Sequence, residues 1–231
     1  MNSSQLTPVA QDYIKVVWSL QEWSDQPVTT KDLAERLGVG TSTVSETVRR
    51  LAAQGLFDHK RYGTIKLTDE GRRKALEMVR RHRLIETFLV SELGYTWDEV
   101  HDEAEVLEHA VSDLMIERID ARLGYPTRDP HGDPIPSKDL IIAAPEAFTL
   151  AVLNEGAHGT VSRISDEDPR VLRYFSDLGF GLDATVKIVQ RNEPVGVLDI
   201  EWSPAHTPHE THTLTLGLLA ADAVWIVVKK Q

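Results

Sequence analysis

The side chains of this chain that could bind a metal ion gather in one short stretch. Residues 101–109 read HDEAEVLEH, and Ser112 follows three residues later. On a helix, residues three, four or seven positions apart share a face. That spacing would group two imidazoles and two carboxylates: His101, Glu105, Glu108 and His109. Such a face indicates either a divalent-metal site or a solvated acidic surface, and the stretch alone leaves both interpretations open.

The helix that must carry this stretch is predicted over about residues 98–123. Its other face is apolar and continues past the acidic residues through four large side chains: Leu114, Met115, Ile116 and Ile119. Because this is more apolar surface than one helix contact needs, we expect the helix to form a homodimer interface.

Metal-binding side chains also occur on two other predicted helices. A helix over residues 68–91 carries His82 and Glu86 one turn apart, on one face, where both could bind the same ion. An N-terminal helix over about residues 8–24 has an apolar stripe, and Asp12 lies next to that stripe instead of opposite it. This is an unusual position for a carboxylate that is only solvated.

The composition restricts the kind of metal site and the kind of protein. The chain has 231 residues, 41% of them hydrophobic, and no cysteine, which excludes disulfides and thiolate ligands. Any metal is therefore held by oxygen and nitrogen atoms. No apolar run is long enough to cross a membrane, and the first residues do not resemble a signal peptide. We expect a cytoplasmic protein with no membrane partner.

The net charge of −11 disfavours indiscriminate binding to nucleic acid, but the charge is distributed unevenly. Residues 1–73 contain ten Lys and Arg against nine Asp and Glu, a net +1. Residues 74–140 contain eight against fifteen, a net −7, and residues 141–231 contain seven against twelve, a net −5. A contact with DNA is therefore expected in the first third only.

The first third has the pattern of a winged helix-turn-helix. A short helix over residues 30–37, with Thr30 as its cap, ends at Gly38, and a second helix covers residues 41–54. The start of such a second helix enters the major groove. Residues 56–67 are predicted to form two short strands around a basic tip, which is typical of a wing. The expected DNA contacts come from the second helix and the wing tip: Ser42, Thr43, Ser45, Glu46, Arg49, Arg50, Lys60 and Arg61.

The last third is predicted to form a small β-barrel. Residues 124–140 contain four prolines and are expected to be a linker. Beyond it the pattern predicts a helix over residues 168–178 and five short strands: 160–164, 185–189, 197–200, 213–216 and 224–228. Such strands with short connections indicate an SH3-like barrel. The spacing of His206, His209 and His212 suggests a metal ion, but in a loop the three need not converge.

In this order, the predicted elements resemble the family of the diphtheria toxin repressor and the manganese transport regulators. The strongest motifs are HRLIE from His82, HDEAEVLEH from His101 and PHGDPIP from Pro130. The resemblance implies an α+β fold with three domains. These are a winged helix-turn-helix, a helical metal-binding and dimerisation domain that includes the linker, and an SH3-like barrel, over residues 1–73, 74–140 and 141–231.

The resemblance also implies two metal sites. A primary site would join the first helix to the dimer helix through Asp12, Glu105, Glu108 and His109. An ancillary site would contain His82, Glu86, His101 and Asp166. Iron-responsive members of the family have methionine and cysteine in place of Asp12 and Glu105, and the change to carboxylates favours Mn²⁺ over Fe²⁺ or another divalent transition metal. Short manganese regulators have a glutamate in place of Lys15, so we expect no closely spaced pair of ions here.

The function that we expect is manganese-dependent repression of metal-uptake genes by a homodimer that binds a double-stranded DNA operator and has no small-molecule substrate. Three alternatives stay open. The chain could be an iron-dependent regulator of the same family, or a metal-independent winged-helix regulator whose acidic helix is only a dimer contact. The third alternative, a metal-dependent hydrolase, would need a general base and a substrate cleft, and neither has a signature in the sequence.

Overall fold

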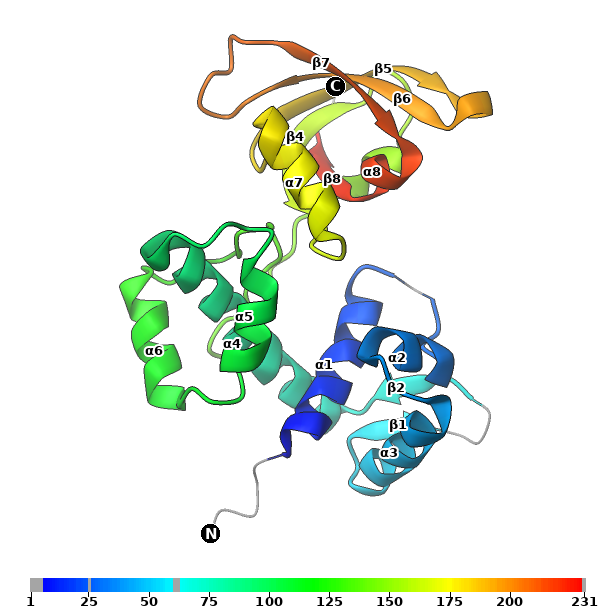
Figure 1. Ribbon diagram of the computed structural model, residues 1–231, viewed down its shortest axis with the longest axis vertical. Coiled ribbons are helices and arrows are strands. Elements are labelled where there is room, and N and C mark those ends of the chain that lie inside the picture. Colours follow the sequence, from blue (N-terminus) through cyan, green and yellow to red (C-terminus); the bar gives the residue numbers. More distant parts are fainter. Residues whose placement is uncertain (1–5, 25, 60–62, 230–231) are drawn as a thin grey trace. The chain divides into compact units, whose positions relative to one another are not determined.

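The computed structural model of the protein describes residues 6–24, 26–59 and 63–229, which fold into two compact units (Figure 1). The first unit consists of the described part of Met1–His82, with Glu108–Ser112 and Pro136–Ile141. The second consists of Arg83–Leu107, Asp113–Ile135 and the described part of Ile142–Gln231. Helix α4 (Asp69–Leu93) continues from the first unit into the second. No helix among these residues is both long enough and apolar enough to span a bilayer.

The first unit contains the predicted winged helix-turn-helix. Its elements are the helices α1 (Pro8–Glu22), α2 (Thr30–Leu37) and α3 (Thr41–Ala53) and the antiparallel strands β1 (Phe57–His59) and β2 (Ile65–Leu67). Thr29, not Thr30, caps α2, because the Thr29 hydroxyl accepts the Asp32 amide while the Asp32 carboxylate accepts the Thr29 amide. The tip residues Lys60 and Arg61 lie outside the described residues.

The predicted single helix over residues 98–123 is wrong. The structure has two helices, α5 (Val100–Leu107) and α6 (Asp113–Arg122), separated by five residues that belong to the first unit. The connection between the two helices is stabilised because Arg81 donates to the Val111 carbonyl, which lies between α5 and α6, at 2.5 Å. The apolar face predicted for this helix is also not continuous. Ala104 is buried, whereas Val106 and Leu114 are 69% and 62% exposed.

The barrel domain forms one antiparallel six-stranded sheet in the order β3-β8-β4-β5-β6-β7. The strands are β3 (Phe148–Thr149), β4 (His158–Ile164), β5 (Thr185–Asn192), β6 (Val197–Ser203), β7 (His212–Gly217) and β8 (Val224–Val228). The five predicted strands and helix α7 (Pro169–Leu178) are present, and the prediction missed β3, α8 (Leu218–Asp222) and the short 3-10 turns Leu150–Val152 and Glu193–Val195. Phe175, Phe180 and Trp202 pack ring against ring in the core.

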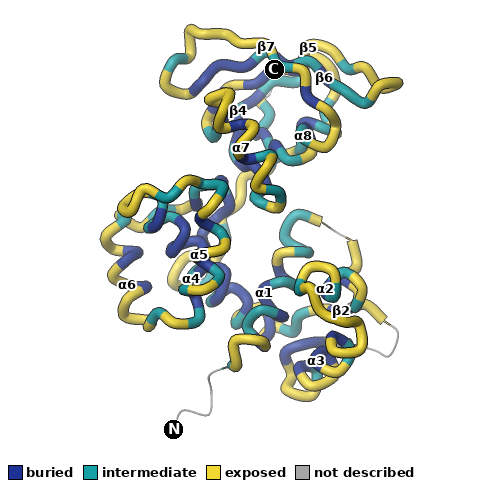
Figure 2. Tube along the Cα trace, viewed as in Figure 1, coloured by how far each residue is buried: buried dark blue, intermediate teal, exposed yellow. Residues whose placement is uncertain are grey.

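The proline-rich segment was predicted as a linker, and this is wrong for its middle part. Asp129, His131 and Asp133 are buried. Figure 2 colours the described chain by burial, with buried residues in dark blue. The segment folds back on itself because the Asp129 carboxylate accepts the amides of His131 and Asp133, both at 2.9 Å. It also lies against β4, where the Ile164 amide donates to the His131 carbonyl at 2.9 Å.

Gly132 marks the closest approach of this segment to β4. Its φ is +93°, and a Cβ there would lie 2.1 Å from the Ser162 carbonyl oxygen. Gly124 has a φ of +73°, but nothing lies within 4 Å of a Cβ placed there. A substitution at Gly124 therefore measures only the cost of the positive φ, without the steric clash, and serves as the control. We predict that Gly132→Ala lowers the free energy of unfolding by about 3 kcal/mol and Gly124→Ala by about 1 kcal/mol. Denaturant melts of the metal-free protein measure both, and equal losses would contradict the close approach.

Candidate metal centres

The first group of metal-binding side chains lies wholly in the first unit, and we call it the Glu108 cluster: Asp12, Lys15, His82, Glu108 and His109. Glu108 is at its centre and its side chain is fully buried. Its Oε1 atom is 2.6 Å from Lys15 Nζ and its Oε2 atom is 2.6 Å from His82 Nδ1. The cluster therefore joins α1 and α4 to the turn that follows α5.

Glu108 stays ionised although it is buried. Burial opposes the charged form, but the hydrogen bond from His82 and the positive charges of His82 and Lys15 outweigh it and lower the pKa of Glu108. A buried carboxylate held in its charged form by hydrogen-bonded partners is available to a cation without first losing a proton.

Asp12 and His109 complete the group of possible ligands. His109 Nε2 is 2.9 Å from Asp12 Oδ1 and 3.6 Å from Glu108 Oε1. The other ring nitrogen, Nδ1, is 2.8 Å from Gln11 Oε1, a contact that holds the ring with Nε2 toward the carboxylates. Asp12, Glu108 and His109 each offer a ligand atom within 4.8 Å of the other two, so these residues fit one metal ion.

Glu105, predicted with these residues, lies on α5 in the second unit. Its Oε1 atom is 3.5 Å from His101 Nε2, and its side chain is 38% exposed. It precedes Glu108 by three residues. Although α5 ends at Leu107, Glu105 and Glu108, together with His82, offer ligand atoms within 4.8 Å of one another.

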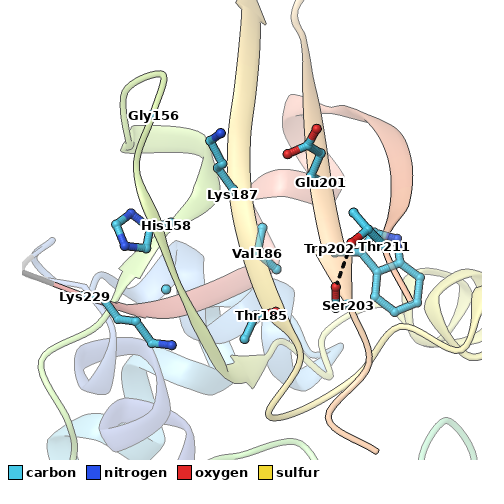
Figure 3. Close-up of a pocket in the computed structure, with 11 residues that line it drawn as sticks. Gly156, His158, Thr185, Val186, Lys187, Glu201, Trp202, Ser203, Thr211 and Lys229 are labelled. Atoms are coloured by element: carbon cyan, nitrogen blue, oxygen red, sulfur yellow. Dashed lines mark hydrogen bonds between the residues drawn. The ribbon is translucent and has the colours of Figure 1, made fainter. Parts of the chain in front are cut away.

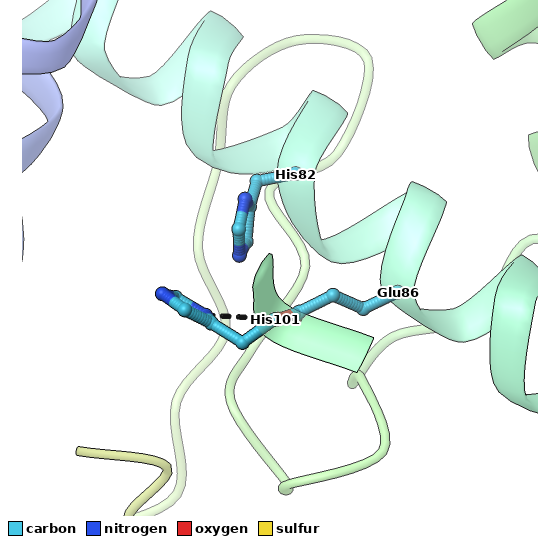
Figure 4. A group of neighbouring side chains, drawn as sticks. All are labelled: His82, Glu86 and His101. Atoms are coloured by element: carbon cyan, nitrogen blue, oxygen red, sulfur yellow. Dashed lines mark hydrogen bonds and ion pairs between the residues drawn. The ribbon is translucent and has the colours of Figure 1, made fainter. Parts of the chain in front are cut away.

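The second group lies wholly in the second unit, and we call it the Glu86 cluster: Glu86, His101, His131 and Asp166. Figure 4 shows Glu86 and His101 facing each other, with His82 one turn earlier on α4. His101 Nδ1 is 3.2 Å from Glu86 Oε1 and 3.4 Å from Asp166 Oδ2. Burial opposes protonation of His101, but its bonds to Asp166 and Glu86 prevail and raise its pKa to about 10.

His131 is the site residue that sequence reasoning missed. It is fully buried, its Nε2 atom is 2.6 Å from the Trp97 carbonyl, and its Nδ1 atom has no hydrogen-bond partner among the described residues. Nδ1 is 4.0 Å from Glu86 Oε2, and Glu86, His131 and Asp166 offer ligand atoms within 4.8 Å of one another. A buried nitrogen in this state fits a metal ligand. The only signal for it was a histidine within the PHGDPIP turn, which was assigned to a linker.

Two arginines support the loop that carries His131. Arg163 Nε is 2.8 Å from Asp133 Oδ1, and Arg83 Nη1 donates to the Pro134 carbonyl at 2.7 Å. Both guanidinium groups are buried and do not belong to the Glu86 cluster. They fix the loop by charged hydrogen bonds that need no metal ion.

The structure brings some of the predicted ligands together and separates others. Glu86, His101 and Asp166 lie in one cluster. His82 offers a ligand atom within 4.8 Å of those of Glu86 and His101, as predicted, and its Nδ1 atom is also 2.6 Å from Glu108 Oε2. His206, His209 and His212 are exposed and occur in no group of converging ligand atoms among the described residues. A pocket on the barrel sheet, drawn in Figure 3, has one imidazole and one carboxylate in its lining, His158 and Glu201, which is too few for a metal centre.

The DNA-reading residues predicted on α3 lie on its outer side. The inward side packs Val44, Val48 and Leu51, all fully buried. Ser45 is half-buried, and its hydroxyl donates to the Thr41 carbonyl at 2.8 Å. The other five are exposed: Ser42, Thr43, Glu46, Arg49 and Arg50. They are accessible to a nucleic acid without any rearrangement of α3.

Comparison with known proteins gives three family matches that follow one another along the chain. Residues 5–65 match the N-terminal DNA binding domain of the iron dependent repressor, and residues 68–137 match its metal binding and dimerisation domain. Residues 148–227 match the FeoA domain.

Among curated proteins, the diphtheria toxin repressor of Corynebacterium jeikeium (strain K411) is 33% identical over 168 residues, which cover 71% of this chain and 70% of that protein. The iron-dependent repressor IdeR of Mycobacterium tuberculosis is 35% identical over 143 residues, which cover 62% of each chain. The match thus spans about three fifths of the length of the curated iron-dependent repressor.

Two solved structures are similar over nearly the whole chain. A manganese-dependent transcriptional repressor in complex with manganese is 56% identical, covers 95% of this chain and 100% of its own, and has a TM-score of 0.90. The manganese regulator SloR is 32% identical, covers 97% of this chain and 100% of its own, and has a TM-score of 0.77.

The Glu108 cluster makes a stability prediction that needs no metal ion. Glu108→Gln removes the negative charge that the buried Lys15 ammonium faces, and breaking a buried ion pair costs about 3–5 kcal/mol. The control Glu77→Gln breaks the partly exposed pairs of Glu77 with Arg73 and Lys74 and should cost less than about 1 kcal/mol. Urea denaturation in the presence of a chelator measures both variants. A loss for Glu108→Gln as small as that of the control would show that the buried pair does not form.

Proposed function

The chain belongs to the iron-dependent repressor family, and from this premise we propose that it is a manganese-dependent transcriptional repressor that binds its operator as a homodimer. The observation that carries the proposal is the approach of Asp12 to the Glu108–His109 pair: His109 Nε2 is 2.9 Å from Asp12 Oδ1 although the two are far apart in sequence. Asp12 is on the first helix of the DNA-binding domain, so the primary metal site includes a ligand from the part of the chain that reads DNA.

The donor atoms support manganese. We assign the primary site to Asp12, Glu108 and His109, with Glu105 as a fourth ligand supplied from three residues before Glu108. This set has three carboxylates and one imidazole, in a chain without cysteine. Hard oxygen donors with one nitrogen suit Mn²⁺, whereas thiolate and thioether donors select softer ions. The two manganese regulators described above agree with this choice, and the curated iron-dependent repressors make Fe²⁺ the second candidate.

The residues of the site perform distinct tasks in this proposal. Glu108 is held ionised by His82 and Lys15, Gln11 fixes the ring of His109, and Asp12 ties α1 to both. A bound ion supplies the positive charge that lets these carboxylates stay close together. With α1 held, the α3 helices of a dimer keep the spacing of successive major grooves, about 34 Å along the duplex.

The Glu86 cluster is proposed as the ancillary metal site, with His131 as a ligand and with His82 as the hydrogen-bond partner of Glu108. Glu86, His131 and Asp166 supply two carboxylates and a buried imidazole, and His101 faces both carboxylates. The α3 residues, with the basic wing tip at Lys60 and Arg61, are proposed to contact the operator. The target genes are proposed to be those of manganese uptake.

Replacing Asp12 tests whether the metal ion holds α1 in place through this carboxylate, a link that we call the tether. Asp12→Ala removes the only primary ligand on the DNA-binding head, so Mn²⁺ should no longer strengthen operator binding; the expected loss is about 10–100-fold in apparent affinity, the usual range for an allosteric coupling. Glu22→Ala, at the end of the same helix, is the control and should respond to Mn²⁺ like the wild type. Fluorescence anisotropy with a labelled operator gives both curves, and a full Mn²⁺ response by Asp12→Ala would refute the tether.

The choice of ion is tested by titration of the same operator complex under anaerobic conditions. At saturating metal, Mn²⁺ should activate operator binding more strongly than Fe²⁺, because selection between the two ions in an oxygen- and imidazole-lined site depends on ligand type and geometry and not on raw affinity. Removing the ion with a chelator should reverse binding. Equal or stronger activation by Fe²⁺ would instead favour an iron-dependent regulator, and binding unaffected by the chelator would favour a metal-independent one.

A further inference from the structure

We propose that Glu46 is a specificity-determining residue of α3 and that it selects a cytosine in each half of the operator. The inference rests on the proposed function, because it takes α3 to enter the major groove. Glu46 is the only acidic residue of α3, and its side chain is exposed on the outer side of that helix. The exposed stripe that contains it also has two hydroxyl groups and two guanidinium groups: Ser42, Thr43, Arg49 and Arg50.

The contacts within the chain give Glu46 no part in holding α3 together. Among the residues that the structure describes, none forms an ion pair or a hydrogen bond with the Glu46 carboxylate. Arg49, one turn later, donates from Nε to the Ser45 carbonyl at 3.2 Å instead. Glu46 is also the sixth residue of α3, beyond the first turn, where the helix dipole would stabilise a carboxylate. Its charge is therefore available to a partner outside the chain.

DNA makes a free carboxylate at this position unfavourable beside most base edges. The phosphates carry one negative charge per about 1.7 Å of duplex and repel a carboxylate that has no partner. In the major groove, guanine presents two acceptors, thymine presents one, and adenine presents an acceptor beside its amino group. Cytosine itself presents only the N4 amino donor there. Cytosine is therefore the base that turns the charge of Glu46 from a source of repulsion into a source of attraction.

The neighbouring side chains of α3 do not duplicate this chemistry. The hydroxyls of Ser42 and Thr43 can donate or accept, so they distinguish the bases less sharply. The Ser45 hydroxyl already donates to the Thr41 carbonyl at 2.8 Å. The two arginines of the stripe carry the positive charge that phosphates attract, and phosphate contacts do not depend on sequence. Glu46 is thus the one side chain of the stripe that can only accept a hydrogen bond.

The experiment selects operators from a pool of random DNA duplexes with the full-length protein and Mn²⁺. Wild type should enrich cytosine at one fixed position of each half-site. Glu46→Gln should enrich adenine at that position, because an amide donates to adenine N7 and accepts from its N6 amino group. Glu46→Ala should accept any base there. Glu35→Gln, which removes an exposed carboxylate from α2, is the matched control and should keep the wild-type preference.

Anisotropy titrations with single-base variants of the selected operator measure the size of the effect. Replacing the cytosine should weaken binding of wild type about tenfold and binding of Glu46→Ala less than about twofold. A purely structural role of Glu46 would instead change the affinity for all operators by one common factor. Because Glu46 has no partner among the described residues, each of its variants should melt at the wild-type temperature.

The outcomes separate the two proposals. If wild type enriches no sequence in the presence of Mn²⁺, the proposed manganese-dependent function fails. If wild type and Glu46→Gln enrich the same sequences, α3 reads the operator without Glu46 and the specificity role is overturned. A wild-type preference for guanine, adenine or thymine at the position that responds to Glu46 would also overturn it.

Discussion

The buried carboxylate of Glu108 is the constraint on which the first unit depends. An ionised carboxylate withdrawn from water is unfavourable by several kcal/mol unless charged or hydrogen-bonding groups meet it. Here those groups come from two helices, since Lys15 is on α1 and His82 is on α4. Satisfying Glu108 therefore brings α1, α4 and the turn after α5 together, and that arrangement puts Asp12 against His109. The metal site is thus a consequence of how one buried charge is neutralised.

The two clusters neutralise their carboxylates in different ways. The Glu108 cluster contains an ammonium group, whereas the Glu86 cluster contains two imidazoles whose pKa values are raised by neighbouring carboxylates, Asp166 and Glu86 for His101, Asp129 and Glu86 for His131. A metal ion that binds the first cluster lies near the charge of Lys15, which stays in place. A metal ion that binds the second cluster must displace protons from the two imidazoles. Arg83 and Arg163 hold the loop that carries His131 through the Pro134 carbonyl and the Asp133 carboxylate, whether the imidazoles are protonated or bound to metal. The frame around the second cluster is therefore independent of its ligands' protonation.

Much of this architecture could be predicted from the sequence because its signals are local. Helix caps, a glycine turn and alternating strands identified the winged helix-turn-helix and five of the six barrel strands. The errors occur where contacts between distant residues override local pattern. The helix break at Glu108 arises from partners on α1 and α4, and the 129–136 loop is buried by arginines from α4 and β4. For the same reason His131 was missed, because nothing next to it in sequence shows that its ring faces Glu86. The membership of Asp12 in the primary group was predicted through family resemblance, not through spacing.

The central claim is that one metal ion lies between Asp12 on α1 and the Glu108–His109 pair. The most direct measurement is a crystal structure of the protein grown with Mn²⁺, with diffraction data collected on both sides of the manganese absorption edge. The account predicts a manganese-specific anomalous peak at coordination distance from Asp12, Glu108 and His109, next to the Lys15 ammonium. No peak at that position, with Lys15 and Glu108 still paired in Mn²⁺-saturated crystals, would contradict it.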